Sequence, residues 1–145
     1  MSDDKKETIQ QELNKAINFL GQNKFSEAEL ICNTIIKKND NADAFHILSS
    51  IKIYNQEFAE SIRLVHKSIA INSDNPGYHV TLGCAYSAAK EYEKSIRPFK
   101  DAIKLNDKIA QVHFYLGESY RKLKNYNDAI SSLYKTIELS PDHIG

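Results

Sequence analysis

Two consecutive segments of equal length decide the fold: residues 76–109 read PGYHVTLGCAYSAAKEYEKSIRPFKDAIKLNDKI, and residues 110–143 read AQVHFYLGESYRKLKNYNDAISSLYKTIELSPDH. Aligned without a gap, they carry the same residue at positions spread along their whole length: His79 and His113, Leu82-Gly83 and Leu116-Gly117, Tyr86 and Tyr120, Tyr92 and Tyr126, Ile96 and Ile130, and Ile103 and Ile137. A register that is kept over a whole segment indicates a tandem repeat with a period of 34 residues.

The same period continues toward the N-terminus. A further shift by 34 residues places Leu48 under Leu82 and Phe58 under Tyr92. A more divergent copy precedes that one, and its alignment needs one residue fewer than the period at the junction 39–42. We therefore predict a single repeat domain over residues 1–145, built from four units at about 9–41, 42–75, 76–109 and 110–143.

Each unit has the pattern of two amphipathic helices. In its second half, apolar residues recur at steps of three and four, as in Ile96, Phe99 and Ile103, which makes one apolar stripe along a helix. Short polar segments such as residues 90–91 and 124–125 separate the two halves of a unit, and links of this length make neighbouring helices antiparallel. The pattern predicts an all-α protein with eight helices.

Several residues predict local features of these helices. Asn75 followed by Pro76 predicts a helix start, and Thr8 with Gln11 resembles a capping box. Glycine inside a helix costs about 1 kcal/mol against alanine, so we expect Gly83 and its counterpart in the last unit to sit where a second helix crosses too closely for a Cβ atom. Pro98 is expected to bend the helix that contains it.

The pattern Leu-Gly-x-x-Tyr, an aromatic residue six positions after the Tyr and a small residue three further on resembles the tetratricopeptide repeat (TPR). Residues 82–86 and 116–120 match it closely, and Ser140-Pro141 supplies the closing proline of the last copy. The resemblance covers about residues 9–141 in four tandem repeats. It implies a right-handed superhelical solenoid of antiparallel helix hairpins that binds a protein or peptide without catalysis or a cofactor.

The resemblance also implies that the first helix of each unit lines a concave groove. By spacing, the residues turned away from the packing seam are the candidate partner-binding residues His46, Ser50, Ile53, Val80, Thr81, Cys84, Ser87, Phe114, Tyr115, Glu118 and Arg121. Val80, Phe114 and Tyr115 are larger apolar groups than a solvated helix face normally exposes. Two interpretations stay open for them, partner binding and packing against the neighbouring unit.

One specialised TPR site can be tested on these positions. Domains of the family that hold the acidic tails of chaperones carry a clamp of Lys, Asn and Arg. Its slots here would hold His46, Ser50, Thr81, Gln111 and Tyr115 or, one unit earlier, Leu13, Ile17, Ile47, Gly77 and Thr81. Neither set contains a cation that could pair with carboxylates, so the sequence argues against such a clamp.

The sequence gives only weak evidence for catalytic groups. His79 and His113 stand where the family usually has an aromatic residue, and we interpret them as hydrogen-bonded packing residues. His46 and Cys84 together suggest a thiol–imidazole pair, but the sequence offers no third group to orient them. Two cysteines are too few for a disulfide framework or a zinc site. We predict no enzyme activity, no metal and no cofactor.

The composition narrows the partner class. Nineteen basic and nineteen acidic residues give a formal net charge of zero. A neutral chain lacks the positive field that phosphate binding requires, so nucleic acid is not expected as a partner. The sequence has no apolar run of about 18 residues and no pattern of a signal peptide, which favours a cytoplasmic protein without membrane insertion.

The leading prediction is a protein–protein interaction module whose concave groove takes a segment of a partner. One alternative is the N-terminal recognition domain of a larger enzyme of glycosyltransferase or sulfotransferase type, and another is a self-assembling scaffold. Repeat arrays normally end in a polar-faced capping helix, whereas the last unit keeps the apolar residues Leu133, Tyr134 and Ile137. We therefore expect a fragment of a longer chain, or self-association through the uncapped C-terminal repeat.

Overall fold

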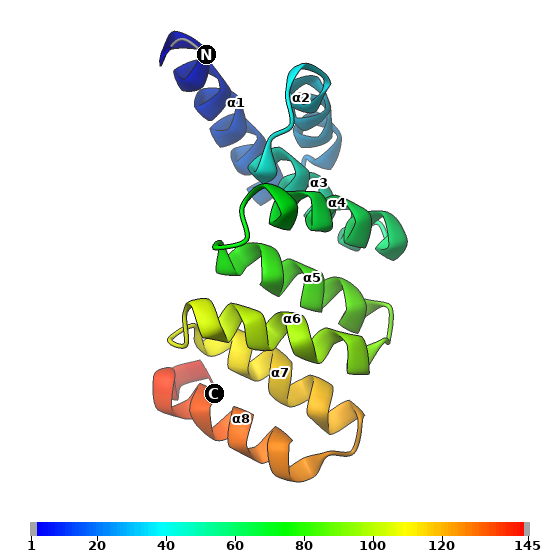
Figure 1. Ribbon diagram of the computed structural model, residues 1–145, viewed down its shortest axis with the longest axis vertical. Helices are drawn as coiled ribbons and strands as arrows, with labels where there is room; N and C mark the ends of the chain where they lie inside the picture. The colour runs from blue at the N-terminus through cyan, green and yellow to red at the C-terminus, as the bar shows by residue number, and fades with distance from the viewer. Residues whose placement is uncertain (1–2, 144–145) are drawn as a thin grey trace. The chain divides into compact units, whose positions relative to one another are not determined.

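The computed structural model describes residues 3–143, with the side chains of residues 4–7 and 143 outside the description. This part of the chain contains eight α-helices, one short 3₁₀ helix and no strand, which confirms the all-α, TPR-like solenoid predicted from the repeat (Figure 1). In chain order the helices are α1 (Asp3–Gly21), α2 (Phe25–Lys38), α3 (Ala42–Tyr54), α4 (Phe58–Ile71), α5 (Pro76–Ala88), α6 (Tyr92–Leu105), α7 (Ala110–Lys122), α8 (Tyr126–Leu139) and η1 (Pro141–His143).

The helices form two compact units. Unit 1 extends to Asn72 and holds α1–α4, and unit 2 begins at Ser73 and holds α5–α8 with η1. Within unit 1, α1 packs against α2, α2 against α3 and α3 against α4, and the two first helices α1 and α3 also touch. Unit 2 repeats this arrangement with α5–α8, including contact between α5 and α7. The prediction of one repeat domain stays a prediction.

Each hairpin is closed by the same tight turn. One residue per turn has a positive φ: Asn23 at 59°, and Gln56, Lys90 and Lys124 at 63°. In the last turn, the backbone N–H of Lys124 donates to Arg121 O at 3.0 Å, and that of Asn125 donates to Tyr120 O at 2.9 Å. These two bonds are those of a Schellman motif, which satisfies the last carbonyls of the first helix and reverses the chain.

The two helices of each hairpin in unit 2 cross at a glycine, as the sequence predicts. A Cβ atom built on Gly83 would lie 2.5–2.8 Å from ring carbons of Phe99 on α6. On Gly117 it would lie 3.0 Å from the side chain of Leu133 on α8. Because Phe99 is only 1% exposed, its ring has no room to withdraw. The missing Cβ therefore sets how closely the helices approach.

Unit 1 fills the equivalent crossing with a serine pair. Ser49 on α3 and Ser61 on α4 are both fully buried. The Ser49 Oγ donates to Ser61 O and the Ser61 Oγ donates to Ser49 O, each at 2.9 Å. Small side chains permit this approach, and the reciprocal hydrogen bonds satisfy hydroxyl groups that would otherwise be costly to bury.

Other local predictions have mixed outcomes. The Asn75 side chain accepts the Gly77 N–H at 2.9 Å and Pro76 begins α5, which confirms that helix start. The capping box at Thr8 is wrong, because Thr8 lies inside α1, which includes the described residues back to Asp3. α6 remains one helix from Tyr92 to Leu105 with buried Pro98 inside it.

The two repeat histidines tie α5 and α7 to the turns before them. His79 Nε2 donates to Ser73 O at 2.9 Å, and His113 Nε2 donates to Asp107 O at 2.8 Å. The same bond, six residues back, recurs in consecutive repeats. These contacts confirm that the histidines are hydrogen-bonded packing residues.

The glycine crossing yields a matched pair of substitutions. Gly83→Ala should destabilise the protein by about 1–3 kcal/mol, because the new methyl group overlaps the Phe99 ring. Gly21→Ala, at a helical position with nothing within 4 Å of the added Cβ, should be neutral or stabilise by up to about 1 kcal/mol. Urea denaturation measures both changes. Equal stability of the two variants would contradict the close-crossing account. The double variant with Phe99→Leu and Gly83→Ala should lose less stability than the sum of the losses in the two single variants.

The turn geometry yields a second prediction. Lys124 adopts the left-handed conformation that disfavours any residue with a Cβ atom. Lys124→Gly should therefore raise the free energy of unfolding by about 0.5–1 kcal/mol. Lys122→Gly, two residues earlier at the end of helix α7, is the control and should lower it by up to about 1 kcal/mol. Thermal unfolding of both variants distinguishes the two signs, and the same sign for both would rule out this account of the turn.

Candidate functional site

Unit 1 contains a hollow between its two first helices, α1 and α3. Its volume is about 280 Å³, and its lining mixes apolar and polar side chains: Gln10, Leu13, Ile17, Leu20, Asp43, His46, Ile47 and Ser50. Leu13 and Ile47 are buried and belong to the core of the unit, whereas the Ile17 side chain is 52% exposed. An exposed branched aliphatic residue over a buried apolar floor is a surface on which a further apolar side chain can pack.

The rim of this hollow is polar, and its described lining residues include no lysine or arginine. Burial lowers the pKa of His46, against an opposing effect of the nearby Asp43 carboxylate, so the imidazole is neutral at pH 7. The Ser50 Oγ donates to His46 O at 3.1 Å, within α3. The hollow therefore offers apolar contact, an uncharged imidazole and one acidic side chain.

The structure places the predicted residues of unit 1 in two groups. His46 and Ser50 line the hollow, whereas Ile53 is half-buried outside its lining. The α1 side of the hollow was missed as a site. Leu13, Ile17 and Leu20 follow a helical spacing of four and three that could have indicated it, but the first repeat copy diverges most from the others.

The first helices of unit 2 use part of their predicted face for packing. Val80, Cys84 and Tyr115 are half-buried against the core of this unit. The Tyr115 ring stacks on Phe99 with 5.7 Å between the ring centroids, and the half-buried Phe114 lies beside it at 6.2 Å. Phe114 is therefore in contact with another aromatic ring of the same face and remains partly accessible.

Ser87 takes part in a hydroxyl network that joins three helices. Ser95 Oγ on α6 donates to Ser119 Oγ on α7 at 2.8 Å, and Ser87 Oγ on α5 lies 3.3 Å from the same oxygen. Ser95 and Ser119 are buried, so these bonds stabilise the stacking of the hairpins. Thr81 is half-buried on the same helix as Ser87.

On the first helices of unit 2, α5 and α7, the charged side chains lie in the C-terminal half of α7. Arg121 donates to both carboxylate oxygens of Glu118, at 2.7 Å and 3.0 Å. The hydrogen bonds from Arg121 lower the pKa of Glu118, so the pair stays ionised at neutral pH. Both groups are largely solvated, and the pair therefore contributes little to stability.

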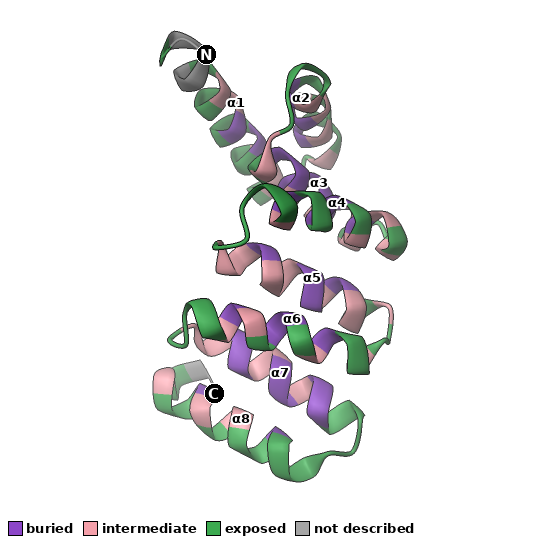
Figure 2. Ribbon diagram, viewed as in Figure 1, coloured by how far each residue is buried: buried purple, intermediate pink, exposed green. Residues whose placement is uncertain are grey.

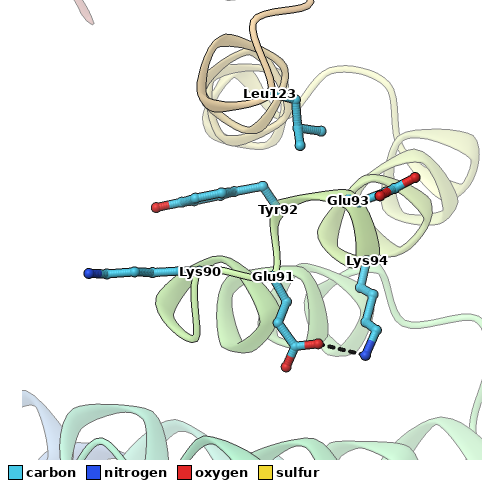
Figure 3. Close-up of a pocket in the computed structure, with 6 residues that line it drawn as sticks. All are labelled: Lys90, Glu91, Tyr92, Glu93, Lys94 and Leu123. Atoms are coloured by element: carbon cyan, nitrogen blue, oxygen red, sulfur yellow. Dashed lines mark ion pairs between the residues drawn. The ribbon is translucent and has the colours of Figure 1, made fainter.

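Unit 2 has a hollow of its own, which lies at the turns of its hairpins and was not predicted from the sequence (Figure 3). Its volume is about 460 Å³, and it is lined by Lys90, Glu91, Tyr92, Glu93, Lys94 and Leu123. Lys94 pairs with Glu91 at 2.6 Å, and Leu123 points toward Tyr92 in Figure 3. Two lysines and two glutamates share its rim, which indicates a solvated turn.

The cysteines are poor nucleophiles. Burial raises the pKa of the Cys84 thiol from 9.0 to about 11, and burial with the nearby Glu29 carboxylate raises that of Cys32 to about 12. The thiolate is the reactive form, so neither thiol is activated at neutral pH. Over the described residues, no group of three or more His, Cys, Asp or Glu side chains gathers as a metal site. None of the helices in that part of the chain has the length and apolar character needed to cross a bilayer.

Sequence comparisons identify repeats in the second half of the chain. Tetratricopeptide-repeat family profiles match residues 76–109 and residues 111–143. They fall within the predicted third unit, 76–109, and the predicted fourth unit, 110–143. Among curated proteins, none matches the chain in sequence.

Solved structures of TPR proteins share the fold. A crystal structure of MamA aligns with a TM-score of 0.83 at 18% identity, over 92% of this chain and 78% of that one. TTC0263, a thermophilic TPR protein of Thermus thermophilus, aligns at 0.80 and 19% identity, over 92% and 75%. YrrB, described as a TPR protein with an unusual peptide-binding site, aligns at 0.78 and 15% identity, over 89% and 67%. At these identities the likeness extends to the fold alone.

The thiol pKa values predict slow, strongly pH-dependent alkylation. Because the pKa of Cys84 rises from 9.0 to about 11, its thiolate fraction at pH 7 should be about a hundredfold below that of an unfolded cysteine. Iodoacetamide labelling followed by mass spectrometry should show little modification at pH 7 and a steep increase toward pH 11, with Cys32 slower than Cys84. The protein unfolded in urea is the reference. Rapid labelling of Cys84 at pH 7 in the folded protein would support the thiol–imidazole alternative instead.

Proposed function

Because the chain is a tetratricopeptide-repeat protein, we propose that it binds a segment of a partner protein or peptide on the exposed faces of its first helices. The observation that carries this proposal is the hollow between α1 and α3, in which an exposed Ile17 lies over the buried Leu13 and Ile47. A repeat fold of this kind generally serves as an interaction module, and the chemistry of the hollow suits binding better than catalysis.

In unit 1 the partner contributes an apolar side chain to the hollow. A volume of about 280 Å³ accommodates one or two aliphatic side chains, and burial of each is worth roughly 1.5–3 kcal/mol. His46 and Ser50 on the rim, with Ile53 further along α3, complete the contact. A lining without lysine or arginine among its described residues disfavours acidic tails, and the carboxylate of Asp43 favours a partner segment that is neutral or basic.

In unit 2 the binding face is the surface that remains accessible after packing. Phe114 supplies the apolar contact, and Thr81 with the Glu118–Arg121 pair supplies polar groups. Val80, Cys84, Ser87 and Tyr115 contribute the half-buried floor from which these groups project. Fold similarity to YrrB, a TPR protein with an unusual peptide-binding site, supports this proposal at the level of the fold.

The proposal is tested by placing a charge in the hollow. Peptides selected from a random phage-displayed library on the intact chain provide the probe, and isothermal titration calorimetry measures their affinity. Ile17→Glu should weaken binding at least about tenfold, because the carboxylate loses water on contact with an apolar side chain. Ile17 suits this purpose better than Val80, because Val80 packs on the core and a charge there would disturb folding.

Leu30→Glu is the matched control. Leu30 on α2 is 69% exposed and lies outside the lining of the hollow, so the same change of an exposed aliphatic residue to glutamate should leave affinity unchanged. Circular dichroism verifies that both variants keep their helices. Equal binding by the two variants, or loss of binding in Leu30→Glu alone, would place the partner on another surface.

A further inference from the structure

The last helix exposes a continuous apolar stripe. Four side chains on one face of α8 are largely accessible: Tyr126 (57%), Ile130 (52%), Tyr134 (69%) and Ile137 (41%). Their spacing of four, four and three residues keeps them on one side of the helix over nearly its whole length. Figure 2 shows α8 coloured mostly as exposed, unlike α7 beside it.

The repeat itself shows what normally covers this stripe. Thirty-four residues earlier, Tyr92, Ile96 and Ile103 occupy the same positions on α6, and all three are half-buried. Ile96 and Ile103 pack in the core of unit 2, to which α7 contributes. The stripe on α8 therefore occupies positions that pack against a neighbouring helix in the preceding repeat. Within unit 2, no helix of the described residues covers it.

Two outward positions of α8 differ from those of α6 in a way that enlarges the apolar surface. Where α6 has the exposed Lys100, α8 has Tyr134, and where α6 has the exposed Arg97, α8 has Ser131. A helix that ends a repeat array in water is expected to become more polar on its outer face. The outer face of α8 has lost two positive charges instead and has gained an aromatic ring.

The opposite end of the chain is not suited to cover the stripe. On α7, the positions that take part in packing against α6 include Val112, Tyr115 and Ser119. In the repeat register, the equivalent positions of α1 hold only exposed amide side chains: Gln11, Asn14 and Asn18. Stacking α8 of one copy on α1 of the next would bury these amides against apolar groups at a cost in desolvation.

We infer that the stripe on α8 is a homodimer surface, on which α8 of a second copy packs antiparallel about a two-fold axis. A two-fold contact requires a self-complementary surface, and an uncharged stripe of alternating tyrosine and isoleucine meets that requirement. With the axis between Ile130 and Tyr134, each Ile130 packs against the second copy's Tyr134. Tyrosine at the centre of such a contact is a frequent energetic anchor.

Electrostatics select the antiparallel orientation. Glu138, whose side chain is 69% exposed and pairs with Lys135 at 3.3 Å, borders the stripe near the C-terminal end of α8. The first turn of α8 has no side-chain cap on its N–H groups, and its acidic residue, Asp128, falls on the side of the helix away from the stripe. Antiparallel packing brings each Glu138 toward the positive N-terminal end of the second copy's helix, whereas parallel packing would bring two glutamates together.

Analytical ultracentrifugation of the intact chain tests this inference, from about 10 μM to about 1 mM, the range expected for a small interface. The mass should rise with concentration and level off at two copies. Tyr134→Lys introduces the residue that α6 carries at the equivalent position, so it should fold normally and weaken association at least about tenfold. Leu30→Glu and Asn14→Lys, both outside the stripe, should associate like the unsubstituted chain. Circular dichroism confirms helicity for every variant.

One substitution distinguishes the antiparallel from the parallel dimer, because its expected effects on their affinities have opposite signs. Glu138→Gln should weaken an antiparallel dimer about two- to fivefold, whereas it would strengthen a parallel one by removing the repulsion between two carboxylates. A single-chain mass at the highest concentration, unchanged association of Tyr134→Lys, growth beyond two copies, or tighter binding by Glu138→Gln would each overturn the inference. The first helices play no part in this contact, so its failure and that of the peptide-binding proposal are distinguishable.

Discussion

The close crossing of the two helices in each hairpin is the constraint on which the rest of the structure depends. At Gly83 a single methyl group would overlap the Phe99 ring, and in unit 1 the fully buried Ser49 and Ser61 hold the equivalent contact with paired hydrogen bonds. A close crossing needs a tight turn, which the left-handed residue before each second helix supplies. Small residues thereby fix how closely paired helices approach, and a large side chain such as Phe99 packs against Gly83 in its own hairpin and against Tyr115 in the next.

This packing within and between hairpins leaves two kinds of exposed surface. A first helix that packs against its own hairpin partner on one side and against the next first helix on another presents a third face to the solvent. The hollow between α1 and α3 is such a face, with Ile17 exposed above a buried floor. The second surface is the outer side of α8, where the positions that pack between hairpins elsewhere in unit 2 lie open. Both follow from the same repeat, and each suits a different contact.

Much of the fold could be predicted from the sequence because the repeat fixes it many times over. The 34-residue register predicts the helices, Asn75 and Pro76 predict the start of α5, and Gly83 predicts the crossing. The start of α1 could not be predicted, because the first copy diverges and the chain before Thr8 continues the helix to Asp3. Spacing also could not decide between binding and packing for Val80, Cys84 and Tyr115, since that depends on how far the neighbouring first helix covers them. The hollow escaped prediction for a related reason, because half of its lining comes from α1.

The central claim is that the exposed face of the first helices, and above all the hollow of unit 1, receives a partner segment. Chemical-shift mapping of the backbone amides by NMR, with a library-selected peptide added to the intact chain, tests it most directly. The account predicts that the largest shift changes fall on residues of α1 and α3 that line the hollow, such as Ile17, His46 and Ser50. Shift changes confined to α2 and α4, with the hollow unaffected, would contradict it.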